Sequence, residues 1–334
     1  MRARARLRSM VDAWRPRRTG DVQPGDDDLL AFARRLEQHG LVPALSDDVE
    51  QWAPFLRFAP PGHYYSPIPR HDAITEDAGR IWAFTEHLPG IDPRRADQRE
   101  LVARIAETIG ADRLAEVPTS GRRYSTANVA FGSGDATMLH GMLRLHRPAR
   151  VVEIGSGHSS ALILDVVEAH LPETSVTFVE PYPELLRSLM RPGDESRCRI
   201  VERRAQDLPP DVLAELTDGD ILFIDSTHVV RTGSDVCRLI LDVLPALAPG
   251  VLVHVHDIFW PFEMLRAWVE EGRQWAECYL LRAFLTSNPE WEIVLFNNYL
   301  ATFEPELLER TLPQFMANSG GSIWLRRRTD GDRA

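Results

Sequence analysis

The stretch from Val151 to Ser160 constrains the fold of this chain more than any other segment. A short β-branched run contains Glu153, and Gly155 and Gly157 follow with one residue between them before an apolar helical pattern begins. This order indicates a strand, a tight turn and a helix start, because glycines permit positive φ and let a ligand lie against bare backbone. A dinucleotide fingerprint has a third glycine where this chain has Ser160, so a nucleoside ligand without a pyrophosphate fits the turn better.

Strands and helices alternate after this turn. The pattern predicts strands at 150–154, 175–180, 199–203, 220–225 and 250–256, and helices at 159–170, 183–190, 209–216 and 234–247. Two further strands are expected at 291–296 and 322–326. Such alternation predicts a parallel sheet with right-handed crossovers.

Acidic residues follow the predicted strands where ligands bind in open sheets. Glu180 ends the second strand, about 20 residues after the turn, where such folds place an acid on the ribose hydroxyls. Asp225 and Asp257 end the fourth and fifth strands, and His228 lies three residues beyond Asp225. The carboxyl ends of adjacent parallel strands meet, so we expect Asp225, His228 and Asp257 to converge as catalytic residues.

Two chemical tasks suit this set, and the sequence leaves both open. In one, a neutral His228 removes a substrate proton while a carboxylate orients the ring. In the other, a divalent metal held by Asp225, Asp257 and His256 lowers the pKa of a substrate hydroxyl. A ligand set containing histidine suits a transition metal better than magnesium.

These motifs resemble those of the class I S-adenosylmethionine-dependent methyltransferases, and within them a bacterial small-molecule group. The resemblance rests on the segments 153–157, 178–181, 224–228 and 256–259. It implies an α/β, Rossmann-like, mostly parallel seven-stranded sheet of order 3-2-1-4-5-7-6, with S-adenosylmethionine as cofactor. The implied cofactor-binding residues are Glu153, Gly155, Ser156, Gly157, Ser159, Glu180, Gln206, Asp207 and Asp225. Metal-dependent catechol-type relatives have asparagine where this chain has Ile258, which argues against a magnesium site of that type.

The segment before the sheet is expected to form a mostly helical cap over residues 1–120, ahead of a cofactor-binding domain over 121–328. Residues 26–38 have helical periodicity, whereas four prolines exclude regular structure from 58–70. His63, Tyr64 and Tyr65 in the latter segment are candidates to close over a substrate. Asn128 is a further candidate substrate contact.

Composition excludes several functions. The net charge of −11 argues against binding a nucleic-acid backbone. No lysine occurs in the sequence, so a Schiff-base lysine and a phosphate-loop lysine are both excluded. Three widely spaced cysteines indicate no disulfide framework, and we find no secretory signal or membrane span. These features predict a cytoplasmic protein that binds no membrane.

The expected activity is methyl transfer from S-adenosylmethionine to a hydroxyl or amine of a small molecule, in secondary metabolism such as natural-product biosynthesis. A second possible activity keeps the cofactor but transfers or cyclises its carboxypropyl arm. A metal-dependent oxidation or hydrolysis is also compatible with these residues, as is a non-catalytic cofactor-binding module. A small-molecule substrate and a possible homodimer are the expected partners.

Overall fold

The computed structural model describes residues 62–329 and 331, so the predicted helix at 26–38 lies outside the described residues. The chain divides into two compact units, Met1–Ala83 and Phe84–Ala334. This division differs from the predicted boundary at residue 120, because helix α5 (Arg95–Ile109) packs on helix α6 (Ser133–His146) within the second unit. The described part of the first unit holds the turns from residue 62 and helix α4 (His71–Ile81).

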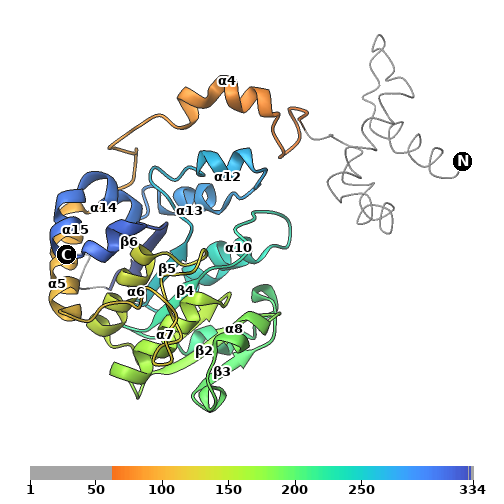
Figure 1. The fold of residues 1–334 in the computed structure, drawn as a ribbon. Coiled ribbons are helices and arrows are strands. Elements are labelled where there is room, and N and C mark those ends of the chain that lie inside the picture. Colours follow the sequence, from red (N-terminus) through yellow and green to blue (C-terminus); the bar gives the residue numbers. More distant parts are fainter. Residues whose placement is uncertain (1–61, 330, 332–334) are drawn as a thin grey trace, which may run out of the picture. The chain divides into compact units, whose positions relative to one another are not determined.

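The second unit is built on a seven-stranded sheet of order β3-β2-β1-β4-β5-β7-β6, as the family resemblance implied. The strands are β1 (Arg150–Ile154), β2 (Ser175–Val179), β3 (Cys198–Val201), β4 (Ile221–Ile224), β5 (Leu252–His256), β6 (Trp291–Phe296) and β7 (Ser322–Arg327). The first five pair in parallel, and β7 is antiparallel to both β5 and β6. The sheet can be followed in Figure 1 from β3 through β4 and β5 to β6.

Alternating side chains of the strands form two apolar layers, as the period of two in a strand requires. Val151, Phe178 and Phe223 point into a core shared with α5, α6 and helix α7 (His158–His170). Val152 and Ile224 point to the opposite face, under the helices that follow β4 and β5. Both faces of the sheet are therefore covered, as expected for a mostly parallel sheet.

The remaining helices connect the strands or follow them. They are α8 (Glu184–Leu189), α9 (Pro210–Ala214), α10 (Asp235–Arg238), the π-helical turn η3 (Leu239–Val243), α11 (Leu244–Ala246), α12 (Arg266–Glu270), α13 (Glu277–Leu285), α14 (Asn297–Phe303) and α15 (Pro305–Thr311), with 3-10 turns η1 (Asp194–Ser196), η2 (Ala205–Asp207) and η4 (Pro313–Ala317). The sequence pattern did not predict α12 to α15. Among the described residues, no helix combines the length and the apolar character that crossing a membrane requires.

Candidate active site

The glycine turn after β1 joins the ends of two neighbouring strands. Gly155 has a φ of +81°, and a Cβ atom there would lie 1.7 Å from the carbonyl oxygen of Asp225. The Asp225 amide in turn donates to the Ile154 carbonyl at 2.8 Å. Gly155 is therefore needed first for backbone packing between β1 and β4, rather than for ligand contact alone.

Gly157 differs from Gly155 in this respect. It precedes α7 with an extended φ of 174°. The nearest atom to a Cβ placed there is a Leu185 side-chain carbon at 3.4 Å. Its bare backbone at the start of a helix is the part of the turn that can receive a ligand, as the sequence predicted.

Glu180 lies beside this turn. Its two carboxylate oxygens accept hydrogen bonds from the Ser156 amide at 3.1 Å and the Tyr182 amide at 2.9 Å. The side chain is partly exposed, so a ligand at the turn can still reach it. The structure thus brings together the turn and the acid that were predicted to bind the ribose.

Glu153 is fully buried at the end of β1 and receives a hydrogen bond from Ser160. Burial raises the pKa of Glu153 to about 8. Among the described residues, Glu153 Oε1, Ser156 Oγ and Ser226 Oγ are buried polar atoms without a hydrogen-bond partner. Such orphaned atoms at the ends of β1 and β4 fit a polar ligand, because buried polar groups are normally paired.

The other predicted cofactor residues lie on the same edge of the sheet or next to it. Ser159 is buried in the first turn of α7. Gln206 and Asp207 form η2 after β3, and the Asp207 carboxylate pairs with Arg204 at 2.6 Å. Their contact with an adenine ring stays a prediction.

Asp225, His228 and Asp257 converge at the ends of β4 and β5. The Nε2 atom of His228 lies 3.4 Å from Asp225 Oδ1 and 3.7 Å from Asp257 Oδ2. His228 and Asp257 both have positive φ, 59° and 55°. Non-glycine residues in this region store strain and are concentrated at functional sites.

Glu277 completes this cluster, and sequence analysis missed it. Its Oε2 atom lies 2.8 Å from His228 Nδ1, and only 2% of the residue is exposed. The amides of Ala276 and Glu277 also donate to the His228 carbonyl, at 2.9 and 3.2 Å. The sequence signal for Glu277 was an acidic residue at the start of an apolar helix. An acid at that position commonly interacts only with the helix dipole, so it does not by itself indicate a functional site.

Charges in the cluster favour an imidazolium. Burial alone would lower the pKa of His228, but hydrogen bonds and charges from Asp225 and Glu277 raise it to about 10. Burial opposes ionisation of Asp225, yet the charge of His256 and the contact with His228 hold its pKa at about 2. Burial raises the pKa of Asp257, and the two histidines only partly offset this. At neutral pH His228 is therefore charged, so it cannot be a plain proton acceptor in this state.

The predicted metal ligands Asp225, Asp257 and His256 do not direct one ligand atom each to a common point. His256 Nε2 lies 3.6 Å from Asp257 Oδ1, and His228 Nε2 approaches both aspartates. Within residues 62–329, the histidine and acidic side chains whose ligand atoms all approach within 4.8 Å lie elsewhere, on α6, α7 and the loop after α5. A metal at the strand ends stays a prediction that this geometry does not favour.

The candidate substrate residues have other surroundings. Asn128 uses its side chain within its own loop, donating to the Ser125 and Phe131 carbonyls and accepting from the Ala130 and Phe131 amides. These bonds stabilise the loop, and the substrate role expected for Asn128 stays a prediction.

His63, Tyr64 and Tyr65 contact one another, with the ring centroids of both adjacent pairs 4.3 Å apart. Tyr64 and Tyr65 are 77% and 62% exposed. All three belong to the first unit, and their closure over a substrate stays a prediction.

Comparison with known proteins matches part of the chain to a described domain. Residues 152–258 match a family described as methyltransferase domain. An uncharacterised protein from Archaeoglobus fulgidus is 30% identical over 129 residues, which are 37% of this chain and 58% of that protein. The chain therefore spans less than two thirds of the length of this curated relative.

Solved structures were also compared. One is the O-methyltransferase TomG from Streptomyces achromogenes, which is involved in tomaymycin synthesis and was solved with S-adenosylmethionine. It is 15% identical to this chain, and the match covers 77% of this chain and 96% of TomG with a TM-score of 0.38. The Podospora anserina methyltransferase PaMTH1, solved with S-adenosylhomocysteine, is 14% identical, with 78% and 97% covered and a TM-score of 0.39.

The sheet order gives the second unit an α/β fold, and residues 152–258 within it match a methyltransferase domain. The domain match agrees with the resemblance of the sequence motifs to the class I S-adenosylmethionine-dependent methyltransferases.

Proposed function

We propose that this protein transfers a methyl group from S-adenosylmethionine to a hydroxyl of a small molecule at the ends of β1, β4 and β5. The observation that carries the proposal is the Asp225–His228–Asp257 cluster, with distances of 3.4 and 3.7 Å, directly beside the Gly155 turn. The turn proposed to bind the cofactor and the cluster proposed to remove the proton thus lie at one edge of the sheet, where ligands bind in this class of fold.

The residues around the turn fit the cofactor. Glu180 presents a carboxylate for two ribose hydroxyls, and the unpartnered Oε1 of Glu153 suits a cationic ammonium group. Gly157 offers open backbone between them. When bound, the cofactor supplies an activated methyl group on a sulfonium whose charge is lost as the methyl group leaves.

The chain's own residues then have two tasks, positioning and proton removal. The His228 imidazolium stabilises negative charge that develops on the acceptor oxygen, as a fixed positive charge in a buried site does. The Asp257 carboxylate, with its raised pKa, accepts the hydroxyl proton. With the cofactor held at the turn, its sulfonium would supply the methyl group to the acceptor oxygen and keep the electron pair of the broken bond, and Asp257 would take up the hydroxyl proton.

Glu277 is a positioning residue in this scheme. It holds His228 through Nδ1, which leaves Nε2 directed at the two aspartates. This arrangement fixes both the charge and the orientation of the ring.

Product analysis distinguishes methyl transfer from arm chemistry and from simple cofactor binding. Purified protein would be incubated with S-adenosylmethionine and a panel of hydroxylated small molecules, and the products measured by mass spectrometry. We expect S-adenosylhomocysteine and a methylated acceptor to form in equal amounts. Methylthioadenosine would indicate chemistry on the carboxypropyl arm. Formation of neither product, together with retained cofactor binding, would indicate a binding module.

Natural-product acceptors, a cytoplasmic location and a homodimer stay predictions. They rest on the motifs and the composition of the chain.

A further inference from the structure

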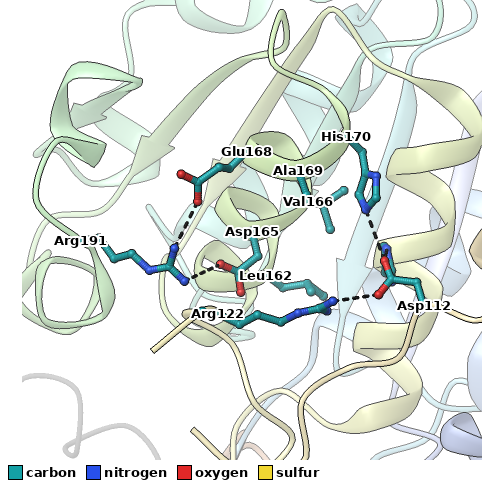
Figure 2. Close-up of a pocket in the computed structure, with 11 residues that line it drawn as sticks. Asp112, Arg122, Leu162, Asp165, Val166, Glu168, Ala169, His170 and Arg191 are labelled. Carbon is teal, nitrogen blue, oxygen red and sulfur yellow. Dashed lines mark hydrogen bonds and ion pairs between the residues drawn. The ribbon is translucent and has the colours of Figure 1, made fainter. Parts of the chain in front are cut away.

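A cavity of about 330 Å³ lies on the α6 and α7 side of the sheet, away from the strand ends. Figure 2 shows Asp112, Arg122, His170 and Arg191 around it. α7 has 13 residues and so is about 20 Å long, with the cofactor turn at its first end and His170 at its last. The cavity therefore lies outside the proposed methyl-transfer site.

Three side chains from separate elements direct ligand atoms to one point beside this cavity. His140 lies on α6, His170 ends α7, and Asp112 lies in the loop after α5. Asp112 Oδ2 is 3.5 Å from His140 Nε2 and 3.3 Å from His170 Nε2, and all three atoms lie within 4.8 Å of one another.

These separations match those between ligands of a tetrahedral metal. Zinc bonds of about 2.0–2.1 Å place neighbouring tetrahedral ligands about 3.3 Å apart. Two of the three pairs have about this spacing, and the ligand nitrogens of the two histidines lie within 4.8 Å of each other. Two imidazoles and a carboxylate are a ligand set that zinc accepts, with a fourth position left for water.

The two oxygens of Asp112 have different partners, since Arg122 bonds to Oδ1 whereas His170 and His140 approach Oδ2. Arg122 donates to Oδ1 at 2.8 Å, while Arg144 is 3.5 Å from Oδ2. A carboxylate that binds a metal through one oxygen normally accepts a hydrogen bond on its other oxygen. The more distant Arg144 is the group that a cation would displace.

The acidic groups on the far wall do not compete for this cation. Asp165 and Glu168 are paired with Arg123, each at 2.8 Å, and Glu168 also pairs with Arg191 at 3.3 Å (Figure 2). The candidate ligand atoms are thus concentrated at the Asp112 end of the cavity.

We propose that Asp112, His140 and His170 form a zinc-binding site that joins α6, α7 and the loop after α5, separate from the methyl-transfer chemistry. A metal there stabilises the packing of the two helices that support the cofactor turn, because a ligand that binds only the folded state raises its stability.

Calorimetric titration of the chelator-treated full chain with zinc chloride tests the proposal. We expect one equivalent of zinc to bind and the midpoint of thermal unfolding to rise with zinc. His170→Gln should weaken zinc binding at least tenfold with its metal-free unfolding midpoint nearly unchanged, because this side chain is partly exposed. His87→Gln, which replaces an exposed histidine away from the cavity, is the matched control and should bind as the wild type does.

Asp112→Asn provides a second variant if His170→Gln does not fold. Magnesium should not replace zinc, since it prefers oxygen ligands in an octahedral arrangement. Absence of saturable zinc binding, or equal affinity in the wild type, His170→Gln and Asp112→Asn, would overturn the site. Zinc lost only in His228→Gln would place the metal at the strand ends and would likewise overturn it.

Discussion

His228 carries a positive charge in a nearly water-free site because carboxylates approach both of its ring nitrogens. Glu277 contacts Nδ1 at 2.8 Å, and Asp225 and Asp257 approach Nε2. A buried charge is tolerated only when paired in this way. The acid–histidine pair was predictable from the sequence, but its protonation state was not, since that depends on Glu277 from a distant helix.

The charge on His228 links stability to pH. Its pKa in the folded state is raised to about 10, above the ordinary value near 6.5. The stabilisation is therefore complete below about pH 6.5 and is lost as the pH rises to about 10. Glu277→Gln removes one carboxylate and should lower the pKa of His228. We expect less stability below pH 6.5 and a weaker decline above it, measured by urea unfolding at several pH values and by NMR titration of His228. Identical pH profiles for the variant and the wild type would contradict this assignment.

Glu153 is an acid whose contribution to stability declines with rising pH, in the same direction as that of His228. Burial raises its pKa to about 8, so the folded state retains a proton that the unfolded state loses near pH 4.5. Stability from this group thus falls as the pH rises from about 4.5 to 8, by at most about 1.4 kcal/mol per pH unit. Glu153→Gln should remove this decline while weakening S-adenosylmethionine binding, as measured by unfolding and by calorimetry. A variant with unchanged cofactor affinity would exclude Glu153 as the partner of the ammonium group.

At the scale of elements, the two glycines of the turn have different tasks. Gly155 combines positive φ with a close approach to the Asp225 backbone, whereas Gly157 has neither. The sequence predicted the turn from both glycines but could not separate them, because the contact with Asp225 forms only when β4 pairs with β1.

Alanine at each glycine should separate folding from binding. Gly155→Ala should destabilise the fold by more than about 3 kcal/mol, through both the left-handed φ and the overlap with a carbonyl. Gly157→Ala should cost about 1 kcal/mol, since alanine is a poor residue before a helix, but should weaken cofactor binding strongly. Thermal unfolding and calorimetric titration of both variants measure this. Equal loss of stability in the two would show that the distinction is incorrect.

Local periodicity made the strands and the crossover helices predictable. Helices α12 to α15 were not predicted, since their short apolar segments lie among aromatic residues that fit either a core strand or a helix. Glu277 begins one of these helices, so missing α13 also meant missing the partner of His228.

At the scale of the whole molecule, the strand order followed from the family resemblance and is confirmed. The division of the chain was less predictable, because α5 joins the second unit through packing on α6 that sequence spacing does not reveal. The Asp112–His140–His170 cluster was not predictable for the same reason: its members come from three elements that meet only in the fold.

The central claim is that the turn after β1 and Glu180 bind S-adenosylmethionine. Calorimetric titration of the full chain with S-adenosylmethionine tests this most directly, in the wild type, in Glu180→Ala, and in Glu184→Ala as an exposed acidic control on α8. We predict one site in the wild type and in the control, and affinity at least about tenfold weaker in Glu180→Ala, because a hydrogen bond to a charged group contributes roughly 1.5–3 kcal/mol. No binding by the wild type, or equal affinity in wild type and Glu180→Ala with both folded, would contradict the account.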